Sequence, residues 1–260
     1  MKFFYRITGQ GLRLQMLALL AGMLLFTSCA ELGRIAEGMG GERPLTEYEV
    51  INGLREALII GSDSAATTLG RLDGYYGNPQ LRIGLPPEAS VITNNLSYIP
   101  GGEALVQNVV QRINRAAEDA ARQAAPVFRT AILNMTIRDG FEILRGENDA
   151  ATNYLMNQTY DELYRLFRPR IQQSTEKELV GSISAADAWN TLTGQWNNVA
   201  NSTVGRLAGF QAVDVDLDDY LTVQALDGLF AKLAEEEAKI RQEPAARVTA
   251  LLRRVFGYAV

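Results

Sequence analysis

The 260-residue sequence contains no histidine and only one cysteine, and these two shortages exclude several classes of site. Without histidine, the chain has no Ser-His-Asp or Cys-His catalytic arrangement, no histidine-based zinc site and no imidazole that titrates near neutral pH. A single cysteine excludes an intrachain disulfide, a cysteine-cluster zinc site and an iron–sulfur centre held by one chain. The fold must therefore draw its stability from the packing of a core.

The first residues have the composition of an export signal. Lys2, Arg6 and Arg13 make a basic start, and an uncharged apolar run of 11 residues follows at positions 16–26. A membrane-spanning helix needs about 20 apolar residues, so this shorter run predicts a signal peptide that is removed after export.

Cys29 stands where a lipoprotein signal peptide would end. The four residues before it, Leu25-Phe26-Thr27-Ser28, resemble a bacterial lipobox, whose cysteine sulfur receives a diacylglyceryl group. We predict a signal peptide at residues 1–28, lipidation of Cys29 and a flexible tether over residues 29–44. Ala30, in place of aspartate, resembles the outer-membrane sorting signal of enteric-type bacteria, so the predicted location is the cell envelope, at the outer membrane facing the periplasm by that resemblance. The alternative is an ordinary signal peptide followed by an unrelated cysteine.

Positive charge is in short supply as well. The chain has 25 Lys and Arg against 30 Asp and Glu, and its first 28 residues carry three basic and no acidic side chains. The mature chain would keep 22 basic and 30 acidic side chains, a net charge of −8. This balance opposes nonspecific binding to nucleic acid or to an anionic membrane surface, and we predict no nucleic-acid partner.

Helical periodicity dominates the chain after the tether. Thr46 and Glu49 form a capping box at the start of a helix that continues to about residue 69. Residues 70–102 contain six glycines and four prolines, which predicts a long packed loop. We therefore predict one all-α domain over residues 45–260, with about eight helices and little or no strand. The other helical segments are predicted at 106–124, 127–135, 137–145, 149–168, 226–240 and 244–256, with a loop at 194–209.

Several motifs along this domain resemble one known family. They are LTEYEVINGLREAL at 45–58, DGYYGNP at 73–79, IGLPPEA at 83–89, NRAAEDAA at 114–121, MTIRDGFEILRGENDAATNYL at 135–155, LYRLFRPRIQQ at 163–173 and the segment 215–256. Together they resemble the bacterial envelope family catalogued as domain of unknown function 4197. The resemblance implies an exported, usually lipid-anchored and mainly helical domain. It implies no reaction and no ligand, so it supplies no catalytic residues.

An aspartate cluster precedes the helix predicted at 226–240. Asp214, Asp216 and Asp218 alternate along the chain, and such carboxylates can converge on a hard cation such as calcium. The spacing fails as an EF-hand, because Asp219 stands where that loop requires glycine. The alternative is that Asp218 or Asp219 caps the following helix. No other cofactor is predicted.

Arginine supplies a second candidate site. Arg165, Arg168 and Arg170 surround Pro169, and Arg138 lies in the preceding segment. A guanidinium is suited to bidentate pairing with a phosphate or carboxylate, so these four residues could bind an anion. The alternative is pairing within the protein, with acidic residues such as Asp139, Glu142 or Asp161.

The loop at 73–79 is a third candidate. Asp73, Tyr75, Tyr76 and Asn78 combine flat amphipathic rings with polar groups, between glycines that permit close backbone approach. This composition suits a ligand-binding loop and equally suits a structural plug at the end of a helical bundle.

Two further patterns favour structural roles. Trp189 and Trp196 are seven residues apart and so share one helix face, which is more typical of a core than of a carbohydrate platform. The acidic run 235–237 lies near basic residues, and we predict a solvated helix face with local ion pairs.

The sequence as a whole predicts a lipid-anchored envelope protein that acts as a non-enzymatic binding or structural module. Its expected partners are the membrane, through the lipid anchor, and an envelope protein or a small ligand. One alternative is a carboxylate-based hydrolase, with or without a metal, that uses the aspartates at 214–219. Another is a carrier that holds an apolar ligand between its helices.

Overall fold

Helices account for all the regular structure in the part of the chain that the computed structural model describes, residues 43–138 and 140–258. This part has ten α-helices, three short 3-10 helices and a single isolated bridge between Val180 and Ile183. The all-α prediction is confirmed. From Leu45 onward, these described residues form one compact unit. The predicted signal peptide, Cys29 and most of the tether lie outside the described residues.

Seven of the α-helices are nine or more residues long, and the other three are short. The long helices are α3 (Glu47–Leu69), α5 (Gly102–Ala121), α6 (Ala124–Asn134), α8 (Ala150–Thr175), α9 (Ala185–Ala200), α11 (Leu217–Gln242) and α12 (Ala250–Tyr258). The short elements are η1 (Pro87–Ala89), α4 (Ser90–Thr93), η2 (Leu96–Tyr98), α7 (Gly140–Leu144), α10 (Thr203–Leu207) and η3 (Pro244–Ala246). Helices of four or five residues are too short to show a hydrophobic period, which explains why the sequence predicted about eight. Within the described ranges, none of these helices has the length and apolarity needed to cross a bilayer.

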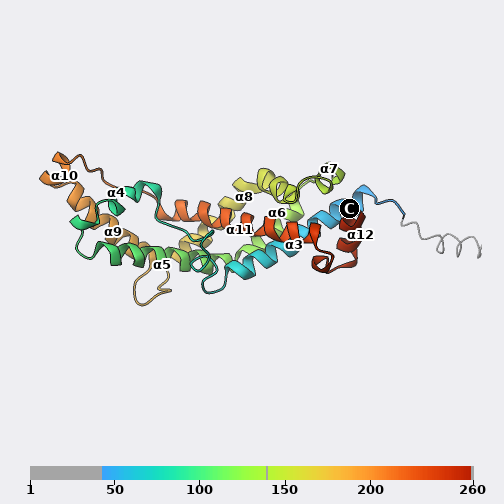
Figure 1. The fold of residues 1–260 in the computed structure, drawn as a ribbon, viewed down its shortest axis with the longest axis horizontal. Helices are drawn as coiled ribbons and strands as arrows, with labels where there is room; N and C mark the ends of the chain where they lie inside the picture. The colour runs from blue at the N-terminus through green and yellow to red at the C-terminus, as the bar shows by residue number, and fades with distance from the viewer. Residues whose placement is uncertain (1–42, 139, 259–260) are drawn as a thin grey trace, which may run out of the picture. The chain divides into compact units, whose positions relative to one another are not determined.

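The helix α11 is central to the packing of this unit (Figure 1). It lies along both α3 and α8, while α3 also contacts α6, α7 and α12. The helix α5 packs against α8 and α9, so the core extends from α8 toward α9 and α10. The start of α3, the short helix α7 and the C-terminal helix α12 therefore gather in one part of the unit.

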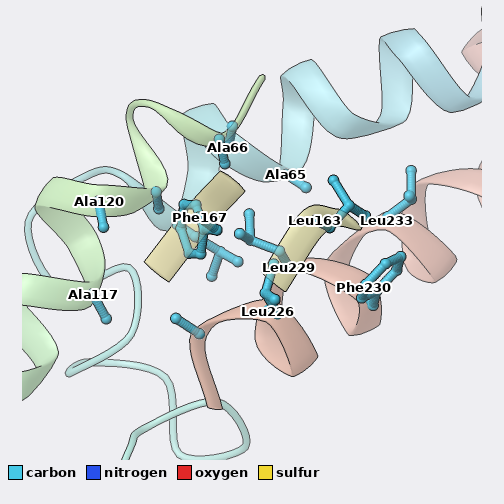
Figure 2. Packing of buried hydrophobic residues seen from close by; sticks show 14 of the residues in the cluster. Ala65, Ala66, Ala117, Ala120, Leu163, Phe167, Leu226, Leu229, Phe230 and Leu233 are labelled. Atoms are coloured by element: carbon cyan, nitrogen blue, oxygen red, sulfur yellow. The ribbon is translucent and has the colours of Figure 1, made fainter. Parts of the chain in front are cut away.

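Small and large side chains alternate where these helices meet. Figure 2 shows Phe167 of α8 beside Ala66 of α3 and the alanines of α5, with side chains of α11 closing the cluster. Phe167, Ala117 and Ala120 are fully buried. Alanine lets the helix backbones approach closely, and burying each large side chain contributes about 1.5–3 kcal/mol to folding. The contribution of α11 consists of Leu226, Leu229, Phe230 and Leu233.

The capping box predicted at the start of the first helix is present. The Thr46 hydroxyl accepts a hydrogen bond from the backbone N–H of Glu49, and the Glu49 carboxylate accepts one from the backbone N–H of Thr46. These bonds satisfy two N–H groups that helix geometry leaves without partners.

Several segments differ from the sequence prediction, among them the start of α11, which lies at Leu217 and not at residue 226. The stretch 194–209, predicted as loop, continues α9 to Ala200 and then forms α10, whose first turn is capped by the Ser202 hydroxyl. Burial of the Trp196 ring and its N–H bond to the Gln211 carbonyl, at 2.8 Å, stabilise α9 despite its asparagine and glycine content. The helix α8 also runs through Pro169 to Thr175, beyond the end predicted at residue 168.

Candidate functional site

The aspartates of the predicted cation cluster contact different groups of the protein. The Asp216 carboxylate caps α11 by accepting from the Asp219 N–H, and it lies 2.8 Å from the guanidinium of Arg168. Asp218 accepts a hydrogen bond from the Thr175 hydroxyl at 2.6 Å, and Asp214 is exposed. Across residues 43–138 and 140–258, no three acidic or cysteine side chains are grouped as metal ligands. The helix cap predicted at Asp218 or Asp219 is formed by Asp216.

The four candidate arginines make contacts in different parts of the structure. Arg168 faces Asp216 and also Asp219, which additionally accepts a hydrogen bond from the Tyr164 hydroxyl. Arg165 donates to the Asp161 carbonyl at 3.2 Å in its own helix, and Arg170 is exposed. Arg138 lines hollows that none of the other three arginines lines.

The tyrosine loop is tied into the core. The Tyr75 side chain is fully buried, and its hydroxyl donates to the Ala225 carbonyl of α11 at 2.7 Å. The backbone N–H groups of Tyr75 and Tyr76 both donate to one oxygen of the buried Glu118 carboxylate, at 3.2 and 3.1 Å. Burial of the hydroxyl, reinforced by the Glu118 charge, raises the pKa of Tyr75 well above its ordinary range. These contacts match the plug interpretation of the loop.

The other loop candidates make contacts within the same region. Asp73 adopts a left-handed backbone conformation, with φ of 64°, and its carboxylate pairs with Arg115 at 2.7 Å. The guanidinium of Arg82 lies 4.3 Å from the centre of the half-buried Tyr76 ring. Asn78 accepts from the Gln80 N–H at 3.0 Å, as in a local turn.

A more open site lies between the start of α3, the segment before α7, and α7 itself. This hollow of about 900 Å³, called here the Arg138–Arg145 groove, is within the range of ligand sites. Its apolar part consists of Ile51, Ile137 and Phe141, and its charged residues are Glu47, Arg138, Glu142 and Arg145. The sequence indicated Arg138 as a candidate but gave no reason to associate it with Ile51, because that contact joins distant segments.

Backbone groups at positions 135, 136, 138 and 140 are held in place by side chains of two helices. Arg55 of α3 donates to the Met135 carbonyl at 2.8 Å, and Glu47 of α3 accepts from the Gly140 N–H at 2.8 Å. The Tyr154 hydroxyl of α8 donates to the Thr136 carbonyl at 2.8 Å and accepts from the Arg138 N–H at 3.4 Å. The backbone at Arg138 is therefore held at the groove before any ligand binds.

Two guanidinium groups at this groove have no carboxylate partner among the residues that the structure describes. In the described part of the chain, neither Arg138 nor Arg145 makes an ion pair, whereas Arg115, Arg168 and Arg241 all do. The Arg145 guanidinium lies 5.5 Å from the centre of the Phe141 ring, four residues earlier. Of the two acidic groups, Glu47 is engaged by the Gly140 N–H and Glu142 is exposed. The groove thus combines an apolar surface with two available cations.

A second hollow shares Arg138 with the groove. It has a volume of about 420 Å³, lies between α6 and α8, and has a more polar lining. Its polar side chains are Asn134, Thr136, Arg138, Tyr154, Gln158, Thr159 and Glu162. Apart from Arg138, the sequence gave no signal for this hollow, because its residues belong to segments that meet only in the folded chain.

The comparisons with known proteins give one match. The family model described as "Protein of unknown function (DUF4197)" matches residues 44–257. No curated protein and no solved structure matches the chain.

Proposed function

Since the chain belongs to the DUF4197 family, a family of unknown function, we propose its role from its own residues: it is a non-enzymatic binding protein of the cell envelope. The ligand is an anionic amphiphile, and it binds in the Arg138–Arg145 groove. The observation that carries this proposal is a pair of guanidinium groups, without ion-pair partners among residues 43–138 and 140–258, beside the apolar side chains of Ile51 and Phe141.

Charge and shape both support this ligand class. Although the mature chain would be acidic overall, two arginines at a half-apolar surface create a local attraction for one phosphate or carboxylate. A guanidinium forms bidentate hydrogen bonds with such groups, and each bond to a charged group contributes about 1.5–3 kcal/mol. The exposed Glu142 disfavours a ligand with several negative charges. A single anionic group attached to an apolar chain or ring fits best.

The lining favours binding rather than a reaction. The eight residues of the groove include no serine, threonine, cysteine or lysine that could act as a nucleophile. One of its carboxylates, Glu47, accepts a backbone hydrogen bond, which stabilises the groove wall.

The proposed location is the outer membrane, with the domain facing the periplasm. This part of the proposal is supported by the basic start, the apolar run at 16–26 and the position of Cys29. A lipid anchor would keep the domain close to a membrane, which is a source of anionic amphiphiles.

Titration calorimetry with dodecyl phosphate, below its micelle concentration, tests the proposal on the purified full-length protein. We expect saturable binding that weakens at least tenfold in the double variant Arg138→Gln, Arg145→Gln. The control variant Arg165→Gln, Arg170→Gln removes the same charge from exposed positions of α8 and should bind as the wild type does. Equal affinity in the two double variants, or no binding to the wild type, would overturn the proposal.

A further inference from the structure

The hollow beside the groove carries polar groups that make no hydrogen bond within the described part of the chain. Asn134 lies at the end of α6, and Gln158 and Glu162 lie one turn apart on α8. The Gln158 amide has no hydrogen-bond partner among the described side chains, and the same holds for the Asn134 amide and the Glu162 carboxylate. By contrast, the hydroxyls of Tyr154 and Thr159 are engaged by carbonyl groups.

Amides and a carboxylate around one hollow are suited to neutral hydroxyl groups. Each amide both donates and accepts hydrogen bonds, as a hydroxyl does, and a carboxylate accepts from hydroxyl protons. The negative charge of Glu162 disfavours a second phosphate at this place. The hollow therefore differs in chemistry from the groove, although Arg138 lines both.

We infer that the two hollows bind one molecule, an amphiphile whose anionic phosphate at Arg138 links an apolar chain in the groove to a hydroxyl-bearing headgroup in the polar hollow. This inference rests on the proposed function and adds the headgroup to it. The ligand class is an acyl or alkyl phosphodiester of glycerol or of a sugar. The apolar chain contacts Phe141 and Ile51, and the hydroxyls contact Asn134, Gln158 and Glu162.

The order of these groups in the ligand follows from the position of Arg138. This residue lines both hollows, so a ligand whose phosphate stands between its chain and its headgroup can contact the residues of both. Side chains from α3 and α8 bond to the backbone of Met135, Thr136 and Gly140, which fixes the chain on both sides of Arg138.

Three probes test the inference by titration calorimetry on the full-length protein. They are dodecyl phosphate, which lacks the headgroup, dodecyl phosphoglycerol, which has both parts, and glycerol phosphate, which lacks the chain. We expect dodecyl phosphoglycerol to bind at least fivefold more tightly than dodecyl phosphate, and glycerol phosphate to bind most weakly. The double variant Asn134→Ala, Gln158→Ala should abolish the gain from the headgroup and leave the affinity for dodecyl phosphate unchanged.

The outcomes separate the two proposals. Equal binding of the two dodecyl probes would overturn the headgroup inference and leave the proposed function in place. Failure of both dodecyl probes to bind would overturn both. Glycerol phosphate that binds as tightly as dodecyl phosphoglycerol would also overturn the inference, because the ligand would then be a free polyol phosphate. Both substituted residues are exposed, and circular dichroism of the variant checks that the fold is retained.

Discussion

The carboxylate of Glu237 in α11 lies 2.7 Å from the backbone nitrogen of Thr152, in the first turn of α8. The same carboxylate accepts from the Ala151 N–H at 3.0 Å and pairs with Arg241 at 2.7 Å. Arg241 in turn donates to the Leu144 carbonyl near the end of α7, at 2.8 Å. One buried ion pair therefore caps two other helices. The negative Glu237 lies at the N-terminus of α8 and the positive Arg241 at the C-terminus of α7, where the helix dipoles favour these charges.

Replacing Glu237 by glutamine should strongly destabilise the fold. The change removes a buried charge that Arg241 and two backbone N–H groups require, so we expect the free energy of unfolding to fall by about 3–5 kcal/mol. Urea denaturation followed by circular dichroism measures this loss. Glu235→Gln is the matched control, because its ion pair with Lys232 lies at the surface and should change stability by less than about 1 kcal/mol. Similar losses in the two variants would contradict the capping role.

The stability of the protein should fall in alkali through Tyr75. Burial raises the pKa of its hydroxyl above the ordinary value of about 10, so the folded state retains a proton that the unfolded state releases. Its contribution to stability is present below about pH 10 and is lost as the pH rises further. Tyr75→Phe removes the hydrogen bond to Ala225, costs about 1 kcal/mol at neutral pH and should lessen the alkaline loss. Urea denaturation between neutral and alkaline pH tests this, with Tyr76→Phe as the variant that should keep the wild-type dependence.

Two helical glycines should respond to alanine with opposite signs. A Cβ atom at Gly228 of α11 would lie 2.6 Å from the Tyr75 ring, so Gly228→Ala should destabilise the protein by about 1–3 kcal/mol through overpacking. A Cβ atom at Gly194 of α9 would meet no atom within 4 Å, and Gly194→Ala should stabilise the helix by about 0.5–1 kcal/mol. Thermal melting measures both changes. Shifts of the same sign would contradict the packing of the tyrosine loop against α11.

The pairing of Arg168 with Asp216 has a consequence for cation binding. A calcium ion at the aspartates would have to displace this guanidinium and the α11 cap, so we expect no saturable heat when calcium is titrated into the wild-type protein. Saturable heat that disappears in the Asp216→Ala, Asp218→Ala variant would favour a cation site instead.

Because the ion pair between Arg168 and Asp216 is largely exposed, Arg168→Gln should lower the free energy of unfolding by less than about 1 kcal/mol, and added salt should reduce that effect.

Lipidation of Cys29 can be tested in growing bacteria. With labelled palmitate, we expect label on the wild-type protein and its recovery with the outer membrane fraction. Cys29→Ser should remove both, while leaving the helical domain folded. An unlabelled wild-type product would contradict the lipid anchor and the proposed location.

Local patterns were enough to predict most of the helices and the local ion pairs of the run at 235–237, but not the partners of charged residues that lie far apart in the sequence. The capping box at Thr46 depends on residues three positions apart, and the apolar stripe of α5 depends on a repeat of 3.6 residues. The prediction of a solvated helix face at 235–237 was wrong for Glu237, which is buried. The three glutamates are chemically identical, so the local sequence does not indicate which of them is buried. Only the approach of α8 decides which of them is buried.

In the candidate sites too, the residue types follow from the sequence and the contacts follow from packing. From its own residues, the sequence determined an all-α chain with no histidine, a single cysteine, a negative charge and arginines able to bind anions. The tertiary structure decided that Arg168 pairs with Asp216, 48 residues away, and that Arg138 lines a groove with Ile51 of another helix. Helical propensity and capping act over about four residues, whereas ion pairing, burial and the shape of a groove depend on segments that only packing brings together.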